Sequence, residues 1–145
     1  MCEQLDAGQA MPFDFRGAAV YYAGPCPPKP GKPIGSVGPT TSGRMDLYAP
    51  RLMEQGLKIM IGKGLRSAEV SDAIIKHTGI YFAAIGGAAA LMGQCVESAE
   101  VIAYEDLGPE AVRRLVVKEL PVIAAIDSQG KNMYEEGRSA FSNVK

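Results

Sequence analysis

The 145-residue sequence has no tryptophan, a single histidine and no excess of either charge. Fifteen basic side chains stand against sixteen acidic ones, which gives a net charge of −1, and like charges are not grouped in blocks. The electrostatic footprint of a nucleic-acid-binding or membrane-surface protein is therefore missing. Long apolar runs are missing too, because the longest, residues 80–92, is rich in Gly and Ala and falls short of the roughly 20 residues that span a bilayer.

Cysteine is scarce, since the chain has only Cys2, Cys26 and Cys95, at wide spacing. An odd number at such spacing fits neither a disulfide framework nor a zinc or cluster motif. We therefore interpret the thiols as inert or merely exposed. The first residues, MCEQLD, lack the basic region and the apolar run of a secretory signal, so a cytoplasmic location is expected.

Short apolar runs alternate with amphipathic segments, which predicts an α/β fold. A chain of this length can bury one core, so we expect a single domain over residues 1–145, with a polar tail from about residue 135 to 145. A loop rich in Pro and Gly is predicted at residues 24–33. Strands are predicted at residues 18–23, 34–37, 57–61, 81–85, 101–104 and 122–126.

Helices are predicted between several of these strands. Asp46 and Ser67 are expected to cap the first two, because their side chains accept bonds from free backbone N–H groups. Gly56 and Gly79 are expected to end them. The inward faces of these two helices should contain Leu47, Leu52, Met53, Val70, Ala73 and Ile74. Two more helices are predicted at residues 88–95 and 109–118.

The most informative stretch is GPTTSGRMD, residues 38–46. It joins a predicted strand to a predicted helix start, where free N–H groups and the helix dipole favour an anion, and Arg44 can grip a carboxylate or phosphate through two parallel bonds. Gly38 and Gly43 are spaced as in a phosphate loop, but Arg44 replaces its lysine and Met45 its magnesium-binding hydroxyl, so nucleotide hydrolysis is not favoured. A plain turn ending in a helix cap stays open as the simpler interpretation.

GPTTSGRMD resembles the signature segment of the beta-type part of the iron–sulfur hydro-lyases, the class I fumarase and L-tartrate dehydratase family. Further segments are similar to the rest of that part, over residues 11–134: PFDFRGAAVYYAGPCPPKPGKPIGS, IGKG, IYFAAIGGAAAL and ELPVIAAIDSQGKNMY. The resemblance implies a single three-layer α/β domain of the swivelling β/β/α type. It also implies reversible hydration and dehydration of a C4 dicarboxylate such as fumarate, malate or tartrate.

Site residues follow from the resemblance by motif position. Thr40 would transfer the proton, while Thr41, Arg44 and Lys63 would bind the substrate carboxylates. Taken alone, a lysine between two glycines is more often simply solvated. In the family, cysteines of an alpha-type part hold a [4Fe–4S] cluster, which accepts the hydroxyl of the substrate. The present cysteines do not match those ligands, so we expect no metal on this chain and an alpha-type subunit or domain as its partner, in a homo- or hetero-oligomer.

An Arg-Asp-x-x-His segment normally precedes this region in the family, whereas the present sequence begins after it. We therefore expect a part shortened at its N-terminus and inactive without the alpha-type part. The sequence separates neither fumarate from tartrate nor a separate subunit from a domain, and it does not show how Thr40 is activated. An alternative of another class stays open: a non-catalytic module that binds a small anion or a nucleotide through the loop at residues 38–44.

Overall fold

Four strands form the central sheet of the computed structural model, which describes residues 1–142. In spatial order they are β1 (Ala19–Tyr21), β4 (Ile59–Gly62), β5 (Ile80–Ala83) and β8 (Ile123–Ile126). The first three run parallel and β8 runs antiparallel to β5. Parallel neighbours need a crossover, and α3 (Ala68–Lys76) supplies the one between β4 and β5. The predicted α/β class is confirmed.

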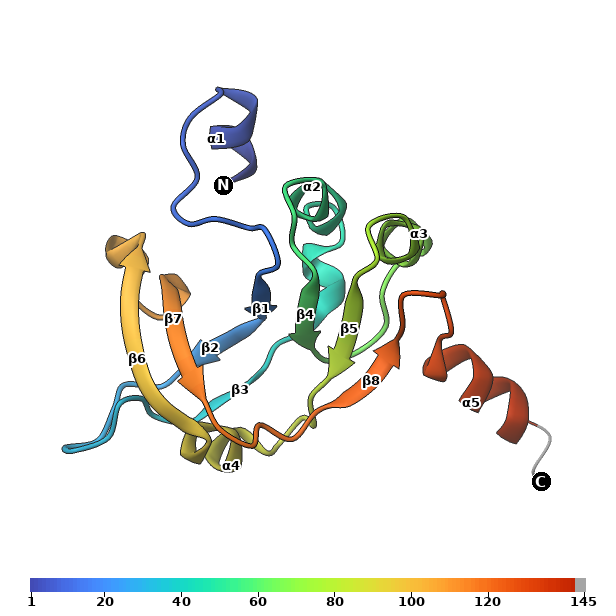
Figure 1. Cartoon of the computed structure of the whole chain (residues 1–145). Coiled ribbons are helices and arrows are strands. Elements are labelled where there is room, and N and C mark those ends of the chain that lie inside the picture. Colours follow the sequence, from blue (N-terminus) through green and yellow to red (C-terminus); the bar gives the residue numbers. More distant parts are fainter. Residues whose placement is uncertain (143–145) are drawn as a thin grey trace.

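Two smaller antiparallel pairs form separate two-stranded sheets. Strand β2 (Ala23–Pro25) pairs with β3 (Val37–Pro39), and β6 (Val96–Ala103) pairs with β7 (Val112–Val117) across the 3₁₀ helix η2 (Glu105–Glu110). Figure 1 shows the β6–β7 hairpin at one end of the molecule and helix α5 (Met133–Phe141) at the other. The short N-terminal helix α1 (Cys2–Asp6) stands near α2 (Ala49–Glu54) in the same view.

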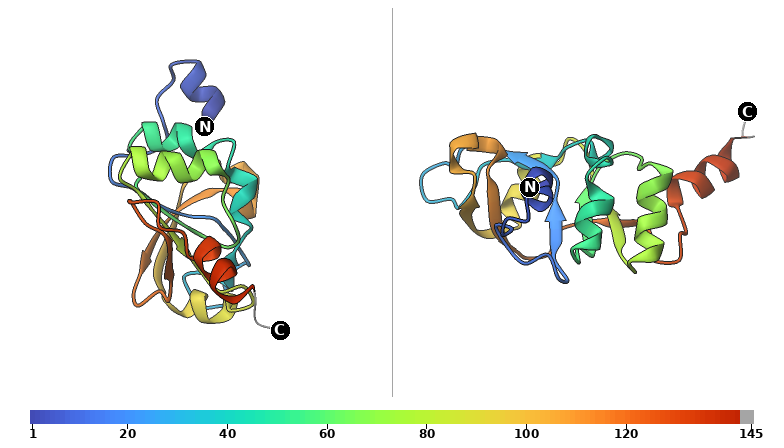
Figure 2. Two further views of the ribbon diagram at one scale, coloured as in Figure 1. Left: turned by 90° about the vertical axis from the view of Figure 1, so that its right-hand side faces the viewer. Right: turned by 90° about the horizontal axis from the view of Figure 1, so that it is seen from above.

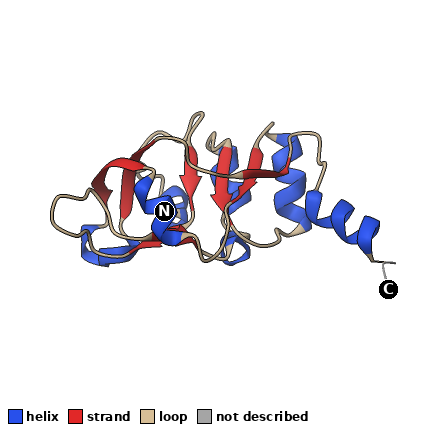
Figure 3. Cartoon of the chain, turned by 90° about the horizontal axis from the view of Figure 1, so that it is seen from below, coloured by secondary structure: helices blue, strands red, loops and turns tan. Residues whose placement is uncertain are grey.

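Helices α2 and α3 lie side by side over one face of the four-stranded sheet (Figure 2). The main core fills the space between them and the sheet, and its members include Leu52, Met53, Leu57, Met60, Val70, Ile74, Tyr81 and Ile126. Seen from below, the strands face the viewer (Figure 3). A second cluster packs around Met92 of α4 (Ala89–Gln94) and Val37 of β3. Within residues 1–142, none of the helices combines the length and apolarity needed to cross a membrane.

Several predicted elements are confirmed by the structure. Ser67 caps α3 by accepting a bond from the backbone N–H of Val70, and Val70, Ala73 and Ile74 form the buried face. Strands occur within or beside all the predicted ranges, although the one expected at residues 34–37 is β3, shifted to Val37–Pro39. Helix α5 occupies most of the predicted polar tail, whose residues 143–145 lie outside the described part.

The helix predicted at residues 109–118 is wrong, because most of these residues form strand β7. The apolar positions there fit a helical period, but Val112, Val116 and Val117 are β-branched and pair with β6. Pro109 lies in η2 instead of beginning an α-helix. Pairing with the non-local strand β6 therefore overrides the local helical pattern.

Two predicted helix boundaries also differ in their details. Leu47 is 78% exposed and precedes α2, whose N-terminal cap is Tyr48, so Asp46 does not cap a helix. At the end of α3, Thr78 takes the left-handed conformation (φ 52°) that Gly79 was expected to take. Gly79 serves close packing instead, because a Cβ there would lie 2.6 Å from Cε of Met53.

Candidate functional site

The loops that follow β3 and β4 run side by side. Thr41 and Lys63 form a parallel bridge, in which the Lys63 N–H donates to the Thr40 carbonyl (3.2 Å) and the Ser42 N–H donates to the Lys63 carbonyl (2.9 Å). The Thr40 N–H donates to the carbonyl of Tyr22 (2.8 Å). Residues far apart in the sequence are thus joined through their backbones at the carboxyl end of β4, the edge where α/β sheets usually bind ligands.

The structure brings all four predicted site residues to this edge, and we call Thr40, Thr41, Arg44 and Lys63 the rim. Thr40 and Lys63 are half-buried, while Thr41 and Arg44 are exposed. Arg44 lies in the 3₁₀ helix η1 (Ser42–Met45). Among residues 1–142, no carboxylate forms an ion pair with Arg44 or Lys63. The rim therefore offers two cations and two hydroxyls that are not paired within the described chain.

Lys63 extends toward the turn that follows β5. A Cβ at Gly86 would lie 3.6 Å from Cδ of Lys63 and 3.9 Å from its Nζ, both ordinary contact distances. A methyl group at position 86 would therefore lie in van der Waals contact with the end of the Lys63 side chain.

Beneath the rim, Asp46 and Arg66 form a buried ion pair. Nε of Arg66 donates to Oδ1 of Asp46 at 2.7 Å, and the backbone N–H of Ser67 donates to Oδ2 at 2.6 Å. The Arg66 side chain is fully buried and that of Asp46 is 15% exposed. Asp46 therefore connects the end of η1 to the start of α3, which is why it does not cap a helix of its own.

Arg66 also lies against two tyrosine rings. Its guanidinium carbon is 4.9 Å from the centre of the Tyr81 ring and 5.4 Å from that of Tyr22, within the range of cation–π attraction. Burial raises the pKa of Tyr22, and the Arg66 guanidinium opposes that shift. Within the described residues, Nη2 of Arg66 and the hydroxyl of Tyr22 find no hydrogen-bond partner.

Ser42 and Tyr81 complete this buried layer. The Tyr81 hydroxyl lies 3.0 Å from Oγ of Ser42 and 3.0 Å from the carbonyl oxygen of Gly64, and both side chains are fully buried. A Cβ at Gly62 would lie only 1.9 Å from Oγ of Ser42, so glycine is required at this position of β4. We call Ser42, Asp46, Arg66 and Tyr81 the floor.

The sequence interpretation missed the floor. It assigned Asp46 to a helix cap and gave no role to Arg66 or Tyr81. The available signals were weak: an arginine directly before a serine cap, and a tyrosine inside an apolar strand. The anion site was also expected at the start of an α-helix, but α2 begins at Ala49, beyond η1, so the helix dipole does not act on this loop.

The cysteines lie apart from one another. Cys2 begins α1, Cys26 follows β2, and Cys95 follows α4. Among residues 1–142, His, Cys, Asp and Glu side chains form no group of three that could hold a metal ion. The described residues thus do not fit the ligand set of a [4Fe–4S] cluster.

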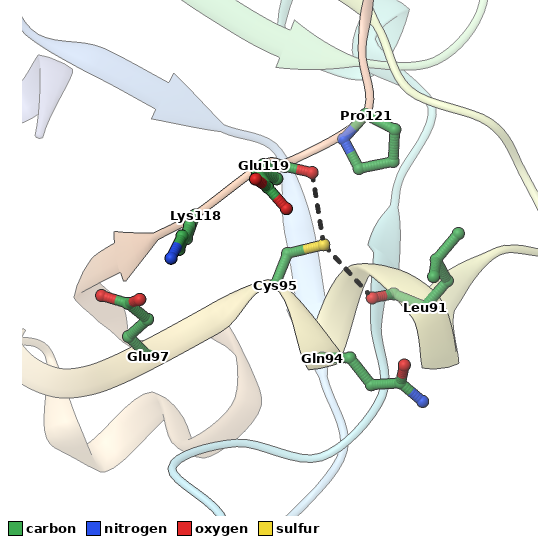
Figure 4. Close-up of a pocket in the computed structure, with 7 residues that line it drawn as sticks. All are labelled: Leu91, Gln94, Cys95, Glu97, Lys118, Glu119 and Pro121. Atoms are coloured by element: carbon green, nitrogen blue, oxygen red, sulfur yellow. Dashed lines mark hydrogen bonds between the residues drawn. The ribbon is translucent and has the colours of Figure 1, made fainter.

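A separate shallow hollow lies between α4 and the end of β7 (Figure 4). Cys95 points into it, and its Sγ contacts the backbone carbonyls of Leu91 and Glu119 at 3.5 and 3.6 Å. The charged groups that line it are Glu97, Lys118 and Glu119. A net negative lining repels a dicarboxylate, so the rim is the better candidate for anion binding.

Comparison with known proteins identifies the family of this chain. The family described as "Fumarase C-terminus" matches residues 1–137. The chain is 40% identical over 136 residues to the anaerobic class I fumarate hydratase of Escherichia coli K12, covering 92% of this chain and 25% of that enzyme. It is 39% identical over 138 residues to the mitochondrial fumarate hydratase 1 of Leishmania major, covering 94% and 25%.

A shorter relative is matched over most of its own length. The L(+)-tartrate dehydratase subunit beta of Escherichia coli K12 is 33% identical over 143 residues, covering 95% of this chain and 71% of that subunit. The chain spans about a quarter of the length of the fumarate hydratases that it matches. The resemblance seen in GPTTSGRMD is confirmed over nearly the whole sequence, and this chain belongs to the fumarase C-terminus family.

Proposed function

We propose that this chain is the carboxylate-binding part of a hydro-lyase that adds water to, or removes water from, a C4 dicarboxylate. The observation that carries the proposal is the rim: Arg44 and Lys63 lie on joined loops without an acidic partner among the described residues. The named relatives support it, because they are fumarate hydratases and a tartrate dehydratase subunit.

The chemistry of such a reaction matches these residue types. Removal of the proton beside a carboxylate places negative charge on that carboxylate, which nearby cations stabilise. Arg44 would grip one carboxylate through two parallel bonds, with Thr41 donating a further bond and Lys63 supplying a second positive charge. Thr40 would transfer the proton, its hydroxyl made more acidic by the cations around it.

The fold and partners complete the proposal. We assign the domain to the swivelling β/β/α type, which the arrangement of a mixed sheet under two helices supports. An alpha-type part would supply the remaining half of the site, and the [4Fe–4S] cluster would belong to that part. The tartrate dehydratase relative is named as a subunit beta, which supports such a partner. The cytoplasmic location stays a prediction from the sequence.

A nucleotide-binding module is less well supported by the loop geometry. The backbone N–H groups of Thr40, Ser42 and Arg44 donate to the carbonyls of Tyr22, Lys63 and Thr41. Because a phosphate cradle needs free N–H groups, the loop has few left for a phosphate and must bind anions mainly through side chains.

The test is a binding and turnover measurement on the chain assembled with its alpha-type part. We expect malate or tartrate to bind and react, and Arg44→Gln to abolish binding. Arg138→Gln, which changes an exposed arginine of α5, is the matched control and should behave as the unaltered protein. Tighter binding of ATP than of either diacid, without hydratase turnover, would establish the nucleotide-binding alternative.

A further inference from the structure

The hydroxyl of Tyr81 joins the two loops that carry the rim. Tyr81 lies on β5, between α3 and α4 in the sequence, and is fully buried. Its oxygen is 3.0 Å from Oγ of Ser42, which follows Thr41, and 3.0 Å from the carbonyl of Gly64, which follows Lys63. One buried atom of the sheet therefore contacts both loops directly beside proposed substrate-binding residues.

The direction of these hydrogen bonds follows from the groups involved. The Gly64 carbonyl can only accept, so the Tyr81 hydroxyl donates to it, and the Ser42 hydroxyl must donate to Tyr81. Burial raises the pKa of Tyr81 above its ordinary value, so the hydroxyl keeps its proton at neutral pH. A chain that ends at a carbonyl oxygen cannot pass a proton onward, so these bonds fix geometry and do not relay protons to Thr40.

We propose that Tyr81 is a positioning residue, whose hydroxyl sets the spacing between the Thr40–Arg44 segment and Lys63. The catalytic importance of this spacing rests on the proposed function, whereas the hydrogen bonds that set the spacing do not depend on it. A phenylalanine at this position would fill the core as well as the tyrosine ring does. The positioning role requires the hydroxyl, whereas packing of the core does not.

Tyr81→Phe isolates that hydroxyl, and Tyr22→Phe is the matched control. Both tyrosines are buried against Arg66, but the Tyr22 hydroxyl has no partner within residues 1–142. The test is hydrogen–deuterium exchange of the backbone amides of Ser42 and Lys63 in the chain itself. Tyr81→Phe should speed exchange at both amides by roughly tenfold, the loss expected for one hydrogen bond, while Tyr22→Phe leaves it unchanged.

In the assembled enzyme, Tyr81→Phe should lower kcat by about 10- to 100-fold, because small misplacements of reacting groups are costly, with KM changing much less. Ser42→Ala should produce a similar loss, and the double variant should be no worse than the more affected single one, since both changes break one link. If Tyr81→Phe does not fold, the exchange measurement is made on Ser42→Ala instead.

The outcomes separate the two proposals. Unchanged exchange at Ser42 and Lys63 in the folded variant overturns the positioning role, whatever the enzyme does. Equal losses in kcat for Tyr81→Phe and Tyr22→Phe overturn it as well. A wild-type protein that binds no dicarboxylate would overturn the proposed function, and the exchange result would still decide whether the Tyr81 hydroxyl holds the two loops together.

Discussion

The charged residues of the floor and the rim lie a few residues apart in the same two loops, yet the fold surrounds their charges in opposite ways. In the floor, Arg66 is fully buried and its charge is met by Asp46 and by two aromatic rings. In the rim, Arg44 is exposed and Lys63 is half-buried, and neither has an acidic partner within residues 1–142. The fold pairs one arginine with a carboxylate and leaves the other without an acidic partner among the described residues.

Substitutions in the floor and in the rim should therefore have different effects. A buried ion pair that loses one partner leaves an uncompensated charge in a medium of low polarity. A solvated rim side chain can be replaced with little effect on folding. Floor substitutions should therefore lower the free energy of unfolding, and rim substitutions should lower binding or turnover while the fold stays intact.

Thr40→Val should give the largest effect, on turnover alone. The change keeps the shape of the side chain and removes the hydroxyl proposed to transfer the proton, so kcat should fall by about 10²–10⁴. The measurement is kcat and substrate Kd on the assembled enzyme, beside Thr41→Val, which should mainly weaken binding. Normal turnover by Thr40→Val at saturating substrate would reduce the rim to a carboxylate clamp.

Asp46→Ala should give the largest effect on stability. Removal of the carboxylate leaves Arg66 buried without its counter-charge, which costs about 3–5 kcal/mol of the free energy of unfolding. Urea denaturation of the chain measures this cost. The double variant Asp46→Leu with Arg66→Met serves as the comparison and should recover part of the loss, and a single variant as stable as wild type would contradict the contrast.

Arg44→Lys should be intermediate and should affect only the ligand. An ammonium cannot reproduce the planar grip of a guanidinium, so dicarboxylate binding should weaken by about 1.5–3 kcal/mol. The unfolding free energy should stay within about 0.5 kcal/mol of wild type, as for exposed positions in general. Calorimetric titration and denaturation of the same preparation test both halves, and a destabilised protein with normal binding would place Arg44 in the floor.

Ser67→Ala should give the smallest effect. It removes the side-chain cap of α3, whose oxygen lies 3.4 Å from the Val70 nitrogen, but keeps the backbone N–H that donates to Asp46. A loss of about 1 kcal/mol or less is expected from the cap alone. A loss as large as that of Asp46→Ala would show that the start of α3 and the ion pair behave as one unit.

The same contrast explains how much the sequence could predict. The cap at Ser67 and the face of Val70, Ala73 and Ile74 depend on residues within one or two turns, so the periodic pattern revealed them. The rim residues were placed by motif. Arg66 meets Asp46 from 20 positions away and Tyr81 meets Ser42 from 39, so no local pattern could reveal the floor. The helix expected at residues 109–118 failed for the same reason, since β6 decided it.

The close packing of Gly62 against Ser42 restricts which substitutions this protein can accumulate in evolution. Any side chain at position 62 would occupy the space of the Ser42 hydroxyl, 1.9 Å from a Cβ there. A shrinking change at position 42 would free that space, but it would also deprive Tyr81 of its donor. Gly62, Ser42 and Tyr81 are therefore coupled, because a substitution at any one of them disturbs its contact with a second. We expect these three positions to change slowly in evolution.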